Sequence, residues 1–272
     1  MTCSGVDILQ RLPVVGYIEA GSVMTYCKDP HVWGTLPRMK LTAATPLAEL
    51  VADQWGLVTS RQVTDAGVPT NTWQRLVARR DVLERLGHGV YRFKVSAPTD
   101  HLDLRAAWLQ LAPGVWAWDR KPEQGVVSHR SAASLFELGH LPAPIHEFTV
   151  QGRKQSRRPD VRIHQRRLDP EEITKTGGLP VTRPGRIASD LLGDREDPES
   201  IGQVVADAIR GGHERPRAFV PQLAGHASRF GLRRGDGVQL LRWLLDLVGD
   251  PRTSMWMAEA RVVTQETDAY RP

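Results

Sequence analysis

Five polar side chains between residues 71 and 79 are of the types that hydrogen-bond to the edges of DNA bases. Arginine matches the O6 and N7 acceptors of guanine, whereas asparagine and glutamine match the donor and acceptor of adenine. The five side chains are Asn71, Thr72, Gln74, Arg75 and Arg79. The spacing of Trp73, Leu76 and Val77 predicts a helix whose apolar stripe lies opposite this polar face.

Three short helices are predicted to position this face. The first runs from Pro46, with Thr45 as its N-cap, and ends at Gly56. Thr59 and Gln62 stand in capping-box order, so a second helix begins there and is expected to turn Val63 and Ala66 inward. The turn around Gly67 then leads to the third helix, which opens at Pro69 and Thr70.

A basic hairpin follows the third helix. Two alternating runs, Val82 to Leu86 and Val90 to Phe93, flank Gly87-His88-Gly89, which predicts two strands and a glycine-rich tip. Its basic side chains are Arg85, His88, Arg92 and Lys94. Helix, glycine turn, helix and hairpin in this order indicate a winged helix-turn-helix, which makes duplex DNA the leading candidate ligand.

Two alternatives to DNA contact stay open for this segment. Charges opposite a hydrophobic stripe often form only a solvated helix face. Winged helices also serve as protein-interaction modules within assemblies. Loss of nucleic-acid binding even at low salt is the expected signature of the second alternative.

Length and charge agree with a DNA-binding protein of two domains. The 272 residues carry a net charge of +5, and such a basic surface favours an anionic partner without identifying it. Cys3 and Cys27 show neither metal-ligand nor disulfide spacing, which suits a reducing cytoplasm. No stretch has the length of a membrane span or the pattern of a signal peptide, so we expect a cytoplasmic protein with no membrane partner.

The expected fold class is α+β: an N-terminal winged helix-turn-helix domain, then a larger mixed α/β domain with a helical C-terminal half. The expected division is 1–44, an N-terminal arm or extension; 45–95, the winged helix; 96–100, a linker; 101–250, the second domain; and 251–272, a C-terminal tail. The arm is either packed structure or the product of a start upstream of a true initiator at Met39.

The second domain contains three motifs that resemble a known family. They are Val127-Ser128-His129-Arg130-Ser131-Ala132-Ala133, a basic hairpin expected from Gln151 to Arg167, and Gly178-Leu179-Pro180-Val181-Thr182-Arg183-Pro184-Gly185-Arg186 leading to Asp190-Leu191-Leu192. Together with the winged helix they closely resemble AbiEi-type antitoxins of bacterial type IV toxin-antitoxin systems, over about residues 46–248. The N-terminal arm and the chain after Arg252 depart from the family pattern.

The resemblance implies a function for each domain. The winged helix is expected to repress the protein's own operon, with duplex operator DNA as its partner. The second domain is expected to counteract a cognate toxin that resembles a nucleotidyltransferase, without direct contact between the two proteins. By position, the DNA-facing residues carried over are Asn71, Thr72, Gln74, Arg75, Arg79, His88 and Arg92.

A possible second basic patch occupies the segment of the expected hairpin. Its members are Arg153, Lys154, Arg157, Arg158, Arg162, Arg166 and Arg167. As a functional patch they bind the DNA backbone or a nucleic acid that the toxin also handles. As surface residues they only protect the edge of a sheet from pairing with another chain.

Enzymatic readings are disfavoured, and no cofactor is implied. The end of the chain offers Glu259, Glu266 and Asp268 but no lysine, so a nuclease centre is not expected. His129, His140, His146 and His164 lack zinc-type spacing, so we expect no metal site. No partner nucleophile or base is evident for Asp190, and Arg234-Gly235-Asp236-Gly237 reads as a turn. Trp108, Trp116, Trp118 and Trp243 are expected in the core.

The sequence therefore predicts a DNA-binding antitoxin that represses its own operon. A lone winged helix covers a short site, so a dimer or cooperative binding to repeated half-sites is expected. The alternative is an ordinary winged-helix transcriptional regulator whose second domain senses a ligand or mediates assembly. A neighbouring nucleotidyltransferase-like gene distinguishes the two.

Overall fold

The computed structural model describes residues 51–268, with side chains up to Arg261. The first predicted helix therefore lies mostly outside the described residues, and only Val51 and Ala52 of it are seen as helix. The predictions for Thr45, for Met39 and for the arm also fall outside this range. Within residues 51–268, no helix is both long enough and apolar enough to cross a membrane.

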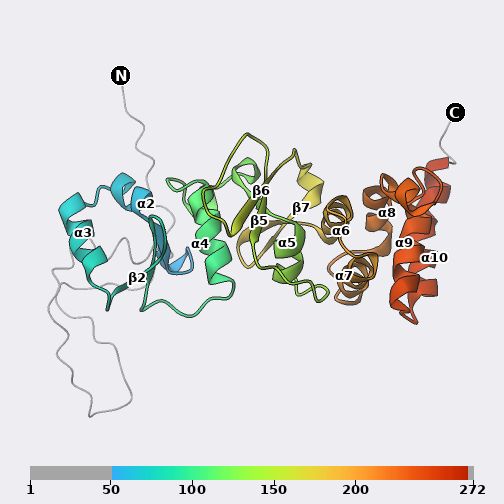
Figure 1. Ribbon diagram of the computed structural model, residues 1–272, viewed down its shortest axis with the longest axis horizontal. Coiled ribbons are helices and arrows are strands. Elements are labelled where there is room, and N and C mark those ends of the chain that lie inside the picture. Colours follow the sequence, from blue (N-terminus) through green and yellow to red (C-terminus); the bar gives the residue numbers. More distant parts are fainter. Residues whose placement is uncertain (1–50, 269–272) are drawn as a thin grey trace, which may run out of the picture. The chain divides into compact units, whose positions relative to one another are not determined.

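The first part of the described chain is a small α+β unit (Figure 1). Its elements are β1 (Leu57–Thr59), α2 (Ser60–Asp65), α3 (Thr70–Ala78), β2 (Leu83–Gly87) and β3 (Val90–Phe93). The strands form an antiparallel sheet in the order β1-β3-β2, with Leu57 opposite Arg92 and Glu84 opposite Arg92 on the other side. The helix-turn-helix and the predicted β2–β3 hairpin are thus both present.

One face of this sheet packs on the two helices. Val58 and Tyr91 from the sheet and Val63 from α2 form a buried cluster with Trp73 of α3. The rings of Trp73 and Tyr91 meet edge to face, with centroids 5.2 Å apart. Ala66, which was expected to face inward, is exposed, so that prediction was wrong; it follows the last turn of α2, where the chain has already left the helical period.

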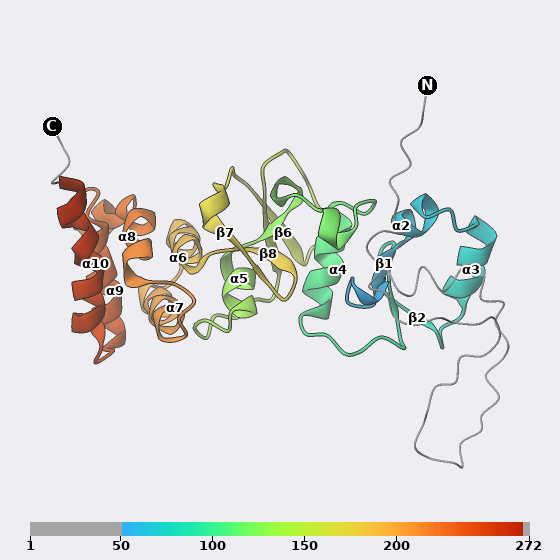
Figure 2. The same ribbon diagram turned by 180° about the vertical axis from the view of Figure 1, so that it is seen from behind.

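The other face of the same sheet packs on α4 (Leu102–Leu111). Leu57 of β1 and Val90 of β3 belong to one buried cluster with Leu104 and Trp108 of α4. Because neighbouring residues of a strand point to opposite faces, Leu57 and Val58 serve these two different cores. In Figures 1 and 2, α4 lies between the winged-helix sheet and the second sheet of the chain.

Two buried glutamines connect the helix-turn-helix to the segment after α4. Gln54 and Gln62 are fully buried, and each side-chain amide donates to the other across 3.0 Å. The remaining amide positions bind backbone: Gln54 donates to Leu57 and accepts from the N–H of Ala117, while Gln62 accepts from Thr59 and donates to Val115. Both amides are therefore completely hydrogen-bonded.

The second sheet has five strands in the order β6-β5-β4-β8-β7. Their bounds are β4 Val126–Val127, β5 His146–Val150, β6 Val161–Gln165, β7 Ile173–Thr176 and β8 Leu179–Thr182. Strands β5 and β6 are parallel, with His146 opposite Val161 and Val150 opposite Gln165. The expected hairpin from Gln151 to Arg167 was therefore wrong: the connection crosses back to the same end of the sheet before β6 begins.

Helices account for most of the remaining chain. They are α5 His129–Leu135, α6 Pro184–Gly193, α7 Pro198–Arg210, α8 Pro216–Ala224, α9 Gly237–Val248 and α10 Thr253–Asp268. The segment after Arg252, which the sequence left unplaced, forms α10. This helix buries Trp256, Met257 and Ala260 in the core shared with α8 and α9.

The predicted fold class, α+β with a helical C-terminal half, is confirmed. The tryptophan prediction was partly wrong. Trp108 is fully buried, but Trp118 is 44 % exposed and stacks on Trp116 with ring centroids 5.2 Å apart. The domain boundaries near residue 98 and residue 250 stay predictions.

Close helix packing predicts opposite effects on stability when two glycines are each replaced by alanine. A Cβ on Gly202, inside α7, would lie 2.4 Å from the carbonyl oxygen of Leu244 in α9, whereas one on Gly193 would meet nothing within 4 Å. We expect Gly202→Ala to lower the free energy of unfolding by about 1–3 kcal/mol despite its better helix propensity. Gly193→Ala, the control, should be neutral or raise it by up to ~1 kcal/mol. Urea denaturation measures both, and equal stabilisation by the two substitutions would contradict the close packing of α7 on α9.

Candidate nucleic-acid interface

The turn between α2 and α3 is built from the predicted capping and turn residues. Thr59 Oγ1 accepts from the N–H of Gln62 at 3.1 Å, and Gln62 Oε1 accepts from the N–H of Thr59 at 2.9 Å. Gly67 has φ +78°, a left-handed conformation that glycine adopts readily. Helix α3 then starts after Pro69. The predicted capping box and glycine turn are confirmed.

Helix α3 presents two different faces. Trp73 is buried, and Leu76 and Val77 are half-buried against the same core. All five predicted base-reading side chains are exposed: Asn71, Thr72, Gln74, Arg75 and Arg79. The structure thus gathers them on the solvent side of α3, and their contact with DNA stays a prediction.

The five side chains differ in the hydrogen bonds and ion pairs that they already make within the protein. Arg79 makes a two-point contact with Asp81, at 2.6 and 3.3 Å, and this hydrogen bonding raises the pKa of Arg79. Asn71 Oδ1 accepts from the N–H of Thr72 at 2.7 Å. Arg75 has no hydrogen bond or ion pair with the residues described in the structure. Arg75 is therefore the arginine of α3 that can reach a base edge without first breaking a contact.

The basic side chains of the hairpin also differ in exposure. Arg85, His88 and Lys94 are exposed. Arg92 is partly buried, donates to the carbonyl oxygens of Ser96 and Ala97 at 3.2 and 3.4 Å, and lies 3.9 Å from Glu84. Its guanidinium is thus occupied within the protein, which weakens the expectation that it contacts phosphate.

One further basic residue, Arg80, was missed by the sequence analysis. It is exposed just beyond the end of α3. With Arg85 and Lys94 it lines an open hollow between α3 and the hairpin. The residue lies outside the helical period used to define the polar face, so only the folded turn brings it to the hairpin cations.

The tip of the hairpin is held against α4. Gln110 of α4 donates to the backbone carbonyl of His88 at 2.9 Å, and Arg158 donates to Gln110 Oε1 at 2.7 Å. The main chain of the tip is therefore fixed to the second part of the chain. This contact leaves the side chains of His88 and Arg85 exposed.

The members of the second basic patch differ in their exposure and in their partners. Arg158 pairs with Asp160, and burial lowers the pKa of Lys154. Arg162 on β6 lies 3.7 Å from Glu147 and 3.8 Å from Asp194. The remaining members are exposed: Arg153, Arg157, Arg166 and Arg167. The structure thus leaves about half of the predicted patch available to an external anion.

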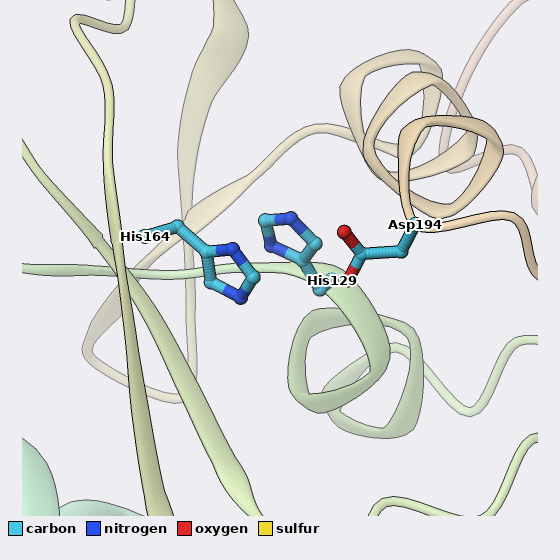
Figure 3. Close-up of side chains that lie close together, drawn as sticks. All are labelled: His129, His164 and Asp194. Atoms are coloured by element: carbon cyan, nitrogen blue, oxygen red, sulfur yellow. The ribbon is translucent and has the colours of Figure 1, made fainter.

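A polar cluster that the sequence analysis did not foresee lies in the second part of the chain (Figure 3). The rings of His129 and His164 stack with centroids 3.5 Å apart and planes 12° apart. His129 begins α5 and His164 lies on β6, so the fold brings together two histidines whose spacing along the chain gave no sign of a cluster. His140 and His146 do not join this stack.

Carboxylates surround the two rings. His164 Nε2 is 3.1 Å from Glu147 Oε1, and His129 Nδ1 is 3.9 Å from Asp190 Oδ2. His129 Nδ1 is also 2.9 Å from Ser128 Oγ. The Nε of Arg186 donates to Asp190 Oδ1 at 2.8 Å, which gives this carboxylate a cationic partner.

Burial dominates the electrostatics of this cluster. It lowers the pKa of His129 to about 3, helped by the proximity of His164. It raises the pKa of Asp190 to about 6, against the attraction of Arg186. His129 is therefore neutral near pH 7, while Asp190 is ionised at a cost in stability.

Comparison with known proteins supports the regulatory class. Residues 46–94 match a family described as "Transcriptional regulator, AbiEi antitoxin". The resemblance to AbiEi antitoxins is confirmed on this segment, and it supports an antitoxin-type DNA-binding regulator in general, a class that is not enzymatic. No curated protein matches the chain. A crystal structure of the RV2827C protein from Mycobacterium tuberculosis is similar at 17 % identity and a TM-score of 0.47, over 82 % of each chain.

The raised pKa of Asp190 predicts a pH-dependent stability difference. Between the unfolded value of 3.8 and the folded value of about 6, the folded state binds more protons, so stability falls as pH rises through this window. Asp190→Asn, which mimics the neutral acid, should therefore gain stability relative to the parent protein from pH 4 to pH 6.5, by about 2 kcal/mol at ~1.4 kcal/mol per pKa unit.

The difference in unfolding free energy between Asp190→Asn and the parent protein reports on Asp190 alone. His129, whose pKa is lowered, changes stability with pH in the opposite direction, but it is present in both proteins and cancels. Urea denaturation in EDTA at pH 4, 5, 6.5 and 7.5 measures it. A difference that stays constant across this range would contradict the burial argument.

Proposed function

We propose that this chain is a DNA-binding antitoxin that represses its own operon through α3 and the β2–β3 hairpin. The observation that carries the proposal is the exposed polar face of α3 on a capped, glycine-turned helix-turn-helix. A helix of this kind enters the major groove, where arginine, asparagine and glutamine discriminate base pairs. The family match covers the same residues.

The exposed cations beside α3 supply the affinity that does not depend on sequence. Arg80, Arg85 and Lys94 surround the hollow between α3 and the hairpin. Contacts of such side chains to phosphate release counterions and set the register of the protein on the duplex. Arg75 then reads bases within that register. Because one α3 covers a short site, two or more protomers on repeated half-sites form the specific complex.

The second part of the chain carries the antitoxin function in this proposal. Its cognate toxin is a nucleotidyltransferase-like protein encoded beside it, and it is countered without direct contact between the two proteins. Support comes from the motifs between Val127 and Leu192 that resemble AbiEi antitoxins. They form the buried strand β4, the start of α5 and the packed strand-to-helix junction of β8 and α6, so they define the core of this part.

The base-reading role is tested at Arg75. Arg75→Ala should weaken binding to the duplex upstream of the protein's own gene by about 1–3 kcal/mol, with a much smaller effect on a scrambled duplex. Arg217, an exposed arginine of α8, provides the matched control, and Arg217→Ala should leave both affinities unchanged. Fluorescence anisotropy across a salt series measures each affinity.

The same experiment contains the outcome that would overturn the proposal. If the parent protein binds both duplexes equally and releases both with modest salt, its surface is only basic. If it binds neither at low salt, the winged helix is a protein-interaction module. Equal weakening by Arg75→Ala on both duplexes would reject base reading at this residue alone.

The exposed part of the second basic set predicts a non-specific contribution. Replacing Arg153 and Arg157 by serine should weaken binding to both duplexes alike and reduce the salt slope by about two, roughly one for each phosphate that the protein no longer neutralises. Serines at the exposed Arg233 and Arg234 form the control. Unchanged affinity and slope would make Arg153 and Arg157 surface residues without a role in DNA binding.

Antitoxin activity is tested by co-expression with the adjacent nucleotidyltransferase-like gene. Arg75→Ala should release operon repression yet still protect cells from the toxin, because the two functions lie in different parts of the chain. Loss of protection despite normal expression would tie neutralisation to DNA binding. Absence of such a gene would favour an ordinary winged-helix regulator.

A further inference from the structure

Two histidines and a carboxylate from three different elements meet in the second part of the chain, away from the residues proposed to read DNA. His129 begins α5, His164 lies on β6, and Asp194 follows the last residue of α6. One ligand atom from each residue lies within 4.8 Å of the other two. Figure 3 shows the Asp194 carboxylate directed toward the ring of His129, which lies between Asp194 and His164.

Each histidine has a further carboxylate within 4 Å of one of its ring nitrogens, although the nearest partner of His129 Nδ1 is Ser128 Oγ. Glu147 Oε1 lies 3.1 Å from Nε2 of His164, and Asp190 Oδ2 lies 3.9 Å from Nδ1 of His129. Histidines that bind metals use one nitrogen for the ion and commonly direct the other to a carboxylate or carbonyl, which orients the ring. His164 has such a partner in Glu147, whereas Nδ1 of His129 hydrogen-bonds to Ser128 Oγ at 2.9 Å and Asp190 lies just beyond hydrogen-bond distance. The second nitrogen of each ring remains for a ligand.

Asp190 independently favours a cation close to His129. Its side chain is only 2 % exposed, and Arg186 satisfies Oδ1. The other oxygen, Oδ2, has no hydrogen-bond partner among the described residues. A buried ionised oxygen without a partner is costly. This oxygen lies 3.9 Å from Nδ1 of His129, so a positive ion bound to that ring would lower the cost of its buried charge.

We propose that His129, His164 and Asp194 bind one divalent transition-metal ion of the zinc type. Two imidazoles and a carboxylate suit such an ion, whereas Mg²⁺ and Ca²⁺ prefer oxygen ligands alone. The partial exposure of His164 and Asp194 leaves the fourth position to water. The ion joins α5, the edge strand β6 and the end of α6, and so stabilises this part of the fold.

Two features of the present geometry must change when the ion binds. The lone pairs of imidazole lie in the ring plane, so rings stacked 3.5 Å apart must rotate out of the stack to share an ion. Arg162 is the second feature. Its guanidinium lies 3.8 Å from Asp194 and 3.7 Å from Glu147, and it is the cation that a metal ion would displace. Removal of Arg162 should therefore tighten metal binding.

The test uses the untagged full-length protein, stripped with EDTA and titrated with Co²⁺ and Zn²⁺. Cys3, Cys27 and His31 lie outside the described residues and are replaced by Ser, Ser and Ala in every sample, so that they cannot bind the ion. We expect one equivalent of Co²⁺ with visible absorption bands, displaced by Zn²⁺ and not by Mg²⁺. His164→Ala and Asp194→Asn should each weaken binding by more than about 100-fold, beyond the 10–100-fold typical of outer-sphere residues.

Two further variants separate ligation from charge and from surface binding. His140→Ala removes an exposed histidine outside the cluster and should bind as the parent does. Arg162→Ala should bind several-fold more tightly. The proposal fails if the parent binds no Co²⁺ at micromolar concentration, or if both His164→Ala and Asp194→Asn bind as tightly as the parent.

Thermal unfolding shows whether each variant is still folded. In EDTA, His164→Ala and Asp194→Asn should keep the parent's cooperative transition, since both side chains are partly exposed. Excess Zn²⁺ should raise the Tm of the parent and of His140→Ala, because an ion that binds only the folded state stabilises it. It should leave the Tm of Asp194→Asn unchanged. An equal rise in all four proteins would place the ion elsewhere and overturn the assignment.

Discussion

The paired amides of Gln54 and Gln62 are the interaction on which the arrangement of the chain depends. Each is fully buried, and every donor and acceptor of both amides is used, partly by each other and partly by backbone on either side of α4. An amide left unpaired in such a site costs more than its hydrogen bond contributes, so the pair admits one geometry. That geometry fixes the start of α2, and with it the direction in which α3 presents Arg75.

The winged-helix sheet has little free surface. One face covers the helix-turn-helix, and the other covers α4 through Leu57 and Val90. The hairpin tip is also bound through the carbonyl of His88 to Gln110. The polar face of α3 is thus presented from a well-packed support, and such a support would reduce the ordering cost of the DNA binding that we propose for it.

Sequence reasoning succeeded where a single residue has a local physical role. The Thr59–Gln62 capping box and the turn at the left-handed Gly67 follow from residues acting within one helical turn of themselves. It failed where contacts between segments far apart in the sequence determine the structure. Whether β5 and β6 pair in parallel is settled by the path of the connection, and both pairings suit the same alternating pattern. Likewise, nothing local to His129 reveals that His164 will stack on it, or that Trp118 will be left outside the core.

Helix α10 has a consequence for how the protein is made. Trp256, Met257 and Ala260 complete a core to which α8 and α9 already contribute. A nascent chain emerging from the ribosome can close the cluster around Val58 and Trp73 early, because its members are near in sequence. The larger core stays open until residue 260 has been synthesised. Until then, apolar side chains of α8 and α9 that α10 covers in the folded protein are open to chaperones and proteases.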